Sequence, residues 1–338
     1  MQASQEVRLR RMAEAGLTPA RLEAAYQAVR RQMPPTPLLE SPTLGALLGR
    51  PVWLKLESVT PVRAFKVRGA IAKATELEAE GRPGPLVTAS AGNHGLAVAF
   101  AGRGLGRKVT VFVPEGANPA KVAAMRAFGA DVDAGGHTLT DLLARVQPFI
   151  ARTGATWIHP FDDPTVIAGQ ASVGREIVEA LPDVAEVVVP VGGGGLLAGV
   201  GSALAQAAPG AGLLGVQMVG ADAMVRSLEA GRVVTLERVE TVADGLAPGT
   251  TSERTLALTG AMADAVVRLE DPSLFWAMRL LLERERVLAE PSGAAGVAAL
   301  LAGQGRGRGS VVVVISGGNC SMQDLARALE TPLPPGLA

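Results

Sequence analysis

The sequence contains a single cysteine, Cys320, in 338 residues. One thiol excludes an internal disulfide and a zinc site built from several cysteines. Lysine is also scarce, because the 32 basic residues divide into 5 Lys and 27 Arg. The 32 acidic residues leave a formal net charge of +0, so a basic excess is absent too. Without a Lys/Arg-rich block, we expect no nucleic-acid partner.

Two stretches bear on export and membrane insertion. Residues 1–14 are polar and charged, so they lack the apolar core of a secretory signal, and we expect a cytoplasmic protein. Residues 187–221 contain no charged side chain, a length that could span a bilayer. Pro190, four consecutive glycines and Pro209 interrupt that run, which predicts strand, loop, helix and strand inside a globular core. We therefore expect no membrane partner.

Short apolar strands alternate with helical segments along the chain, whose hydrophobic fraction is 48%. Strands are expected at residues 52–57, 85–89, 109–113, 131–133, 156–158, 187–191, 213–219 and 311–315. Helices are expected at residues 5–33 with a break at 17–19, then at 69–77, 96–102, 119–128, 138–152, 170–181 and 196–208. This alternation predicts an α/β protein with mostly parallel sheets.

One of the five lysines, Lys66, lies between two apolar residues, Phe65 and Val67. Burial disfavours the ammonium form and lowers a lysine's pKa. A neutral amine can attack a carbonyl carbon and form a Schiff base. The alternative is a surface lysine whose neighbours happen to be apolar. The heptapeptide 64–70 alone leaves both readings open.

Three glycine-containing loops follow expected strands, at residues 90–95, 192–196 and 316–319. In open α/β sheets, ligands bind beyond the carboxyl ends of the strands. The tetraglycine loop can turn several backbone N–H groups and a helix N-terminus toward one phosphate. It is neither a P-loop nor a dinucleotide fingerprint, because the residues that complete those motifs are missing. A glycine turn needed only for close packing is the alternative.

Polar side chains in the other two loops have a functional and a structural interpretation. Asn93 could donate to a phenolate oxygen, and the amides around His94 could hold a carboxylate. Ser316 could hydrogen-bond a pyridine nitrogen, or it could cap a following helix. An Asx-type turn is the alternative at Asn93. Residues interpreted as structural are His137, His159, Asp162, Asp163 and Cys320.

Six motifs occur together and in this order: Ala64–Gly69, Ser90–His94, Gly192–Gly195, Ala243–Leu246, Glu290–Ala294 and Ser316–Asn319. The set resembles the fold-type II pyridoxal-phosphate enzymes, in the threonine/serine dehydratase and serine racemase group. The resemblance implies two open, mostly parallel twisted sheets flanked by helices, as in the tryptophan synthase beta subunit. It also implies a large cofactor-binding domain of residues 1–80 with 162–338, and a small substrate-closing domain of residues 81–161.

The resemblance implies a role for each matching position. Lys66 would hold pyridoxal 5'-phosphate as a Schiff base and later move the Cα proton of the substrate. The implied cofactor-binding residues are Phe65, Lys66, Asn93, Gly192, Gly193, Gly194, Gly195, Leu196, Gly245 and Ser316. The implied substrate-binding residues are Ser90, Ala91, Gly92, Asn93 and His94. No protein-bound metal is expected, and a homodimer or homotetramer is.

The activity implied by the resemblance is that of an L-threonine/L-serine dehydratase, a lyase of amino-acid metabolism. Such an enzyme eliminates water from a β-hydroxy amino acid and yields a 2-oxo acid and ammonia. Ser316 opposite the pyridine nitrogen would leave that nitrogen unprotonated, which suits β-elimination over transamination.

Three departures from the group's pattern define the alternatives. Ala91 replaces a serine that racemases commonly carry, which argues against efficient racemisation. Arg63 stands where glycine is common, and inside the pocket it would favour an acidic substrate such as 3-hydroxyaspartate. Gln217 and Ala223 replace the acidic ligands of a divalent-cation site. A non-catalytic protein that binds a phosphate ligand is the alternative from another class.

Overall fold

The computed structural model describes residues 4–137, 139–334 and 336, and its larger sheet has six strands in the order β1-β2-β10-β7-β8-β9. These strands are β1 (Leu38–Glu40), β2 (Val52–Leu56), β7 (Glu186–Pro190), β8 (Gly212–Met218), β9 (Ala265–Leu269) and β10 (Val311–Ile315). The edge strand β1 pairs antiparallel with β2, and the other neighbours pair parallel. All five residues of β10 are buried, as expected for a parallel strand that helices cover on both faces.

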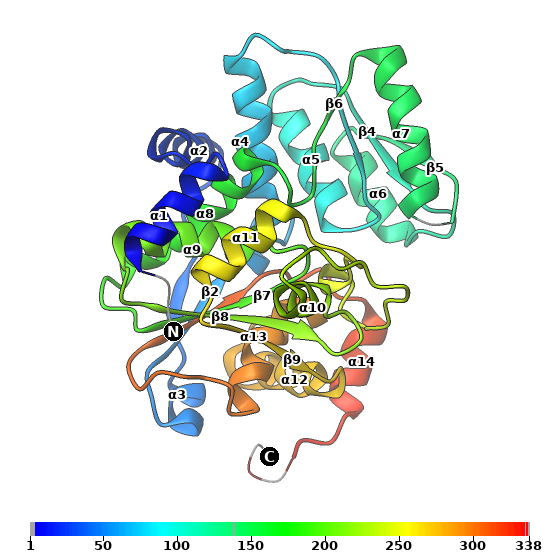
Figure 1. The fold of residues 1–338 in the computed structure, drawn as a ribbon. Helices are drawn as coiled ribbons and strands as arrows, with labels where there is room; N and C mark the ends of the chain where they lie inside the picture. Colours follow the sequence, from blue (N-terminus) through cyan, green and yellow to red (C-terminus); the bar gives the residue numbers. More distant parts are fainter. Residues whose placement is uncertain (1–3, 138, 335, 337–338) are drawn as a thin grey trace.

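A smaller sheet of four parallel strands has the order β5-β4-β3-β6. Its strands are β3 (Leu86–Ala89), β4 (Val109–Val113), β5 (Asp131–Ala134) and β6 (Thr156–Trp157). Figure 1 shows this sheet in the upper part of the molecule with α5, α6 and α7, and the six-stranded sheet below it. The segment that builds the smaller sheet is continuous and lies between β2 and β7 in the chain.

Helices surround both sheets, and several begin at side-chain caps. The helices are α1 (Gln5–Glu14), α2 (Pro19–Gln32), α3 (Pro42–Leu48), α4 (Lys66–Ala79), α5 (Asn93–Gly104), α6 (Pro119–Ala127), α7 (Leu139–Thr153), α8 (Pro164–Ala180), α9 (Gly195–Ala207), α10 (Ala223–Ala230), α11 (Glu253–Met262), α12 (Pro272–Glu285), α13 (Pro291–Leu301) and α14 (Met322–Glu330), with 3-10 turns η1 (Glu57–Val59) and η2 (Asp244–Leu246). Thr18 caps α2, and Asp163 caps α8 by accepting from Thr165 and Val166. The cap at Thr18 lies in the break expected at residues 17–19, and the cap at Asp163 agrees with its structural interpretation.

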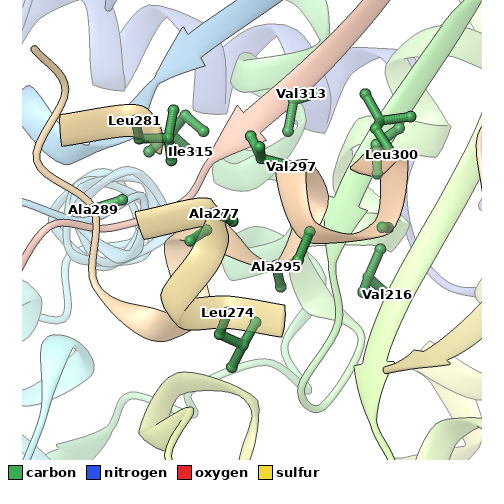
Figure 2. Close-up of a cluster of buried hydrophobic side chains, with 14 of the residues drawn as sticks. Val216, Leu274, Ala277, Leu281, Ala289, Ala295, Val297, Leu300, Val313 and Ile315 are labelled. Carbon is green, nitrogen blue, oxygen red and sulfur yellow. The ribbon is translucent and has the colours of Figure 1, made fainter. Parts of the chain in front are cut away.

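One core fills the space between the six-stranded sheet and the helices α12 and α13. Figure 2 shows Leu281 of α12 beside Ile315 and Val297 of α13 near Val313. Leu274 and Ala277 of α12 belong to the same buried cluster. On the other face of the sheet, residues of α8 and α9 form a second buried cluster with β7 and β10. Helices therefore cover the central strands on both faces. The loops beyond the carboxyl ends of these strands are left as the place where a ligand can bind.

The predicted α/β class with mostly parallel sheets is confirmed, and so is each expected strand. Three expected helices start earlier than predicted: α4 begins at Lys66 itself, α5 begins at Asn93, and α8 begins directly after its cap. Residue 138, the expected start of another helix, lies outside the described residues. The uncharged run of residues 187–221 divides into β7, α9 and β8 as expected. Among the helices in the described part of the chain, none is long and apolar enough to cross a membrane.

Candidate active site

Lys66 opens α4, and the loop after β10 holds the backbone just before it. The Phe65 amide donates to the Ser316 carbonyl oxygen at 3.0 Å. The Nζ atom of Lys66 donates to the Pro160 carbonyl oxygen at 2.8 Å. Burial lowers the pKa of Lys66 to about 8. Lys66 is therefore a fixed, largely desolvated amine with a neutral fraction near neutral pH, which removes the surface-lysine alternative.

The loop of residues 192–195 joins β7 to α9 in a conformation that only glycine fits. A Cβ atom at Gly193 would collide with the ring of Phe161. Gly194 has a φ of 93°, in the left-handed region that side chains disfavour. No side chain caps α9, so the amides of its first turn stay open toward an anion. The backbone geometry suits the predicted phosphate cradle.

Gln217, a buried residue of β8, hydrogen-bonds the first residue of this loop. Its Nε2 atom donates to the Gly192 carbonyl oxygen at 3.5 Å, and its Oε1 atom accepts from the Val225 amide at 3.0 Å. The neighbouring Asp222 forms an ion pair with Arg268 at 2.9 Å. No cluster of three metal-ligating side chains occurs among the residues that the structure describes. Gln217 stands where the group's divalent-cation site has an acidic ligand, and both polar atoms of its side chain are hydrogen-bonded to the protein backbone.

The loop between β3 and α5 presents a helix N-terminus to the same region. No side chain caps α5, whose N-cap residue is Gly92, and Ser90 Oγ accepts from the Gly92 amide at 3.2 Å. His94 is buried, and its Nε2 atom lies 2.9 Å from the Ile158 carbonyl oxygen. Burial lowers the pKa of His94 to about 3, so the imidazole is neutral. An open helix N-terminus suits a substrate carboxylate.

Ser316 and Gly245 follow different strands of the six-stranded sheet. Ser316 is buried at the end of β10. The next helix, α14, is capped by Ser321, so the alternative that Ser316 caps a helix is wrong. The Gly245 amide donates to Ser292 Oγ at 2.9 Å. A Cβ atom at Gly192 would lie 2.8 Å from the Gly245 carbonyl oxygen, so η2 and the glycine loop are in direct contact.

Glu290 and Asn319, for which no role was predicted from the sequence, also belong to the site. Asn93 Nδ2 donates to Glu290 Oε1 at 2.7 Å, and Asn319 Nδ2 donates to Asn93 Oδ1 at 2.8 Å. Both Glu290 and Asn319 lie in motifs on which the family resemblance rested. Membership in these motifs could have marked both residues as candidates for the site. A sequence motif does not show which side chains contact each other in the fold. His159, interpreted as structural, accepts from the Phe161 amide through Nδ1 at 3.1 Å and shapes the turn beside Lys66.

Behind Lys66 lies a cluster of four buried charges from distant parts of the chain. Arg68, two residues after Lys66 on α4, forms ion pairs with Glu57 and Glu176, each at 2.7 Å. Lys55 Nζ lies 2.6 Å from Glu176 Oε2. The side chains of Arg68 and Glu57 are 0% exposed. The two positive and two negative charges compensate one another and fix the first turn of α4 to β2, η1 and α8.

These residues fit pyridoxal 5'-phosphate on the observations of the structure itself. A desolvated amine for the aldehyde and a glycine cradle at a helix N-terminus for the phosphate border one region. Phe161 links them, because it contacts the glycine loop and follows Pro160, which holds the Lys66 amine. A carboxamide at Asn93 and a hydroxyl at Ser316 supply polar groups for the ring.

Comparison with known proteins agrees with this fit. Residues 29–317 match the family described as pyridoxal-phosphate dependent enzymes. The L-threonine ammonia-lyase of Geobacter sulfurreducens is 36% identical over 313 residues, which cover 92% of this chain and 78% of that protein. The L-threonine ammonia-lyase of Thermotoga maritima is 36% identical over 312 residues, covering 92% and 78%.

Two solved structures have the same fold. The threonine deaminase of T.th. has a TM-score of 0.86 and 38% identity, covering 90% of this chain and 99% of that one. The serine racemase of maize has a TM-score of 0.87 and 29% identity, covering 92% and 96%. The family inferred from six short motifs is thereby confirmed. With a family match over most of its length, this chain belongs to the pyridoxal-phosphate dependent enzymes.

Proposed function

We propose that the protein is an L-threonine/L-serine dehydratase that eliminates water from a β-hydroxy amino acid and releases a 2-oxo acid and ammonia. The observation that carries the proposal is the desolvated Lys66 amine between the glycine cradle and the open end of α5. The names of relatives that cover 92% of the chain give the same reaction class.

The chain's own residues have separate tasks in this reaction. Gly192 to Leu196 would hold the cofactor phosphate, and Asn93 and Ser316 would fix its ring. When bound, pyridoxal 5'-phosphate makes the Cα–H bond of an amino acid acidic by accepting the electron pair. The freed Lys66 amine takes the Cα proton, because its pKa of about 8 leaves a neutral fraction. The amides of residues 90–94 hold the carboxylate so that the Cα–H bond faces Lys66.

We propose that residues 81–161 close as a unit over the substrate, against a body of residues 1–80 and 162–338. Contacts between the two parts border the site. Lys121 Nζ lies 3.4 Å from Asp244 Oδ2, and Asn93 hydrogen-bonds Glu290. The Lys66 amine reaches the Pro160 carbonyl oxygen from the other side. Closure would exclude water until the product leaves.

The structure weakens the main alternative substrate. Arg63 is exposed and lines a surface pocket of about 440 Å³ with Leu56, Ser58, Arg286 and Gly318, of which Gly318 belongs to the loop after β10. Arg63 also has a φ of 58°, which explains why glycine suits this position. The exposure of Arg63 argues against its selecting an acidic side chain at Lys66. Ala91 carries no hydroxyl, which argues against efficient racemisation.

The test is release of keto acid from L-threonine, L-serine, D-serine and threo-3-hydroxyaspartate, each assayed separately. We expect 2-oxobutyrate from L-threonine and pyruvate from L-serine. If threo-3-hydroxyaspartate is the one substrate turned over, the enzyme acts on an acidic amino acid and the proposed L-threonine/L-serine specificity is wrong. A protein that binds the cofactor but converts none of the four would contradict the dehydratase proposal and favour a binding protein.

Gly193→Ala is expected to weaken cofactor binding by about tenfold or more, because the new Cβ collides with Phe161 and distorts the phosphate loop. Equilibrium dialysis with pyridoxal 5'-phosphate measures the change. Gly210→Ala is the matched control, since a Cβ there meets no atom within 4 Å. Equal affinity in both variants would show that the glycine loop does not hold the phosphate.

The proposal also includes a cytoplasmic location and assembly as a homodimer or homotetramer. Cell fractionation tests the first, and sedimentation analysis of the purified protein tests the second. An amino-acid substrate is consistent with the relatives' activities.

A further inference from the structure

The carboxylate of Glu290 lies inside the site although its position would ordinarily make it a helix cap. Glu290 is the N-cap residue of α13, yet its side chain makes no capping hydrogen bond. Its side chain instead accepts from Asn93 Nδ2 at 2.7 Å, and the residue is 7% exposed. A Cβ atom at Gly317 would collide with Glu290 Oε1. The glycine after Ser316 therefore makes room for this carboxylate.

The backbone that carries Glu290 is fixed on both sides. Its amide donates to the Gly317 carbonyl oxygen at 3.0 Å. Ala289, directly before it, is packed in the core between α12, α13 and β10 (Figure 2). A carboxylate on such a rigid support can hold a partner in one orientation.

The Asn93 amide is held at both of its ends. Glu290 accepts from Nδ2, while Asn319 donates to Oδ1 at 2.8 Å. Asn319 Nδ2 also donates to the Val62 carbonyl oxygen at 2.8 Å, four residues before Lys66. Asn93 comes from the smaller sheet's first helix, whereas its two partners follow strands and helices of the larger sheet. The three side chains thus join the two halves of the site.

We propose that Glu290 is a positioning residue that, in its ionised form, orients the Asn93 amide toward the bound cofactor and locks the two halves of the site together. An ionised carboxylate can only accept, so it requires Nδ2 of Asn93 on its own side. The second N–H of that amide is then the one donor left for the cofactor. The inference rests on the proposed placement of the cofactor beside Asn93.

Protonation weakens this arrangement. A protonated Glu290 keeps one acceptor oxygen but gains an O–H donor, so it no longer requires Asn93 Nδ2 on its own side. If the amide turned, Nδ2 would face the Asn319 donor. Burial is the main cause that raises the pKa of Glu290 to about 7. The facing ionisable groups are Lys121, which favours the carboxylate, Asp244, which disfavours it, and Cys320. The lock therefore forms above about pH 7 and weakens below it.

The test compares the dissociation constant of pyridoxal 5'-phosphate for the full-length wild type and Glu290→Gln at pH values on either side of 7. Ionisation of the ligand and of Lys66 affects both proteins, so the ratio of the two constants isolates Glu290. We expect that ratio to change by about tenfold between one pH unit above and one unit below 7. Because no substrate is present, the outcome does not depend on whether the protein is a dehydratase.

Asp271→Asn is the matched control, because Asp271 is the N-cap residue of α12 and its carboxylate binds Thr241 and Val242 outside the site. Its ratio to wild type should stay constant with pH. Asn319→Ser provides a second variant, expected to bind the cofactor more weakly at every pH while keeping the pH dependence. A constant ratio for Glu290→Gln, or unchanged affinity in Asn319→Ser, would overturn the proposal.

Discussion

Lys66→Ala is expected to lower the rate of keto-acid release from L-threonine by about 10³-fold or more. The substitution removes both the amine that binds the cofactor aldehyde and the base that takes the Cα proton. The two imidazoles that interact with Lys66 are poor replacements, because burial lowers the pKa of His94 to about 3 and that of His159 to about 4. His94 also has its Nε2 atom on a backbone carbonyl, and His159 Nδ1 accepts from the Phe161 amide. Steady-state assays at saturating cofactor measure the loss.

Lys73→Ala is the control for that experiment. Lys73 lies two helical turns further along α4, where its amine is occupied by ion pairs with Glu76 and Asp163. Its removal should change turnover by less than about threefold. A Lys66→Ala variant that retains a tenth or more of wild-type turnover would remove Lys66 from the mechanism.

Arg68→Met is expected to destabilise the folded protein by about 3–5 kcal/mol, because it leaves Glu57 and Glu176 buried without their main cationic partner. The remaining Lys55 contacts only Glu176 directly. Urea unfolding followed by circular dichroism measures the free energy of unfolding. The first turn of α4 should loosen as well, since Arg68 ties it to η1 and α8.

Arg10→Met gives the comparison with an exposed arginine. Arg10 lies 3.9 Å from Glu14 on α1, with 64% of its side chain exposed. Exposed pairs of this kind contribute about 0–1 kcal/mol, so the variant should unfold close to wild type. Similar losses for the two arginine variants would contradict the account of the buried cluster.

Much of the fold was predictable because local patterns and global packing agree in this chain. Val187 to Val191 and Val311 to Ile315 are uninterrupted apolar runs, and both form central parallel strands. The pair Thr18-Pro19 is typical of a helix start, and α2 begins at Pro19. The tetraglycine loop was predictable for a similar reason, since strand, loop and helix follow one another directly in the sequence.

What the sequence did not reveal depends on contacts between distant residues. Asn93 and Glu290 are 197 positions apart, and their meeting depends on how the two sheets pack. Arg68 and Glu176 are 108 positions apart, and each alone looks like an ordinary surface charge. The helices α10 to α13 fall in residues 220–310, a part of the sequence for which no helix was predicted.

The measurement that tests the central claim most directly is the site of cofactor attachment. Borohydride reduction of the holoenzyme fixes a Schiff base, and peptide mass mapping then identifies the modified lysine. The chain has five lysines, Lys55, Lys66, Lys73, Lys108 and Lys121. The account predicts one pyridoxyl group, on Lys66, with the other four unmodified. A label on another lysine, or none on a protein that binds the cofactor, would contradict it.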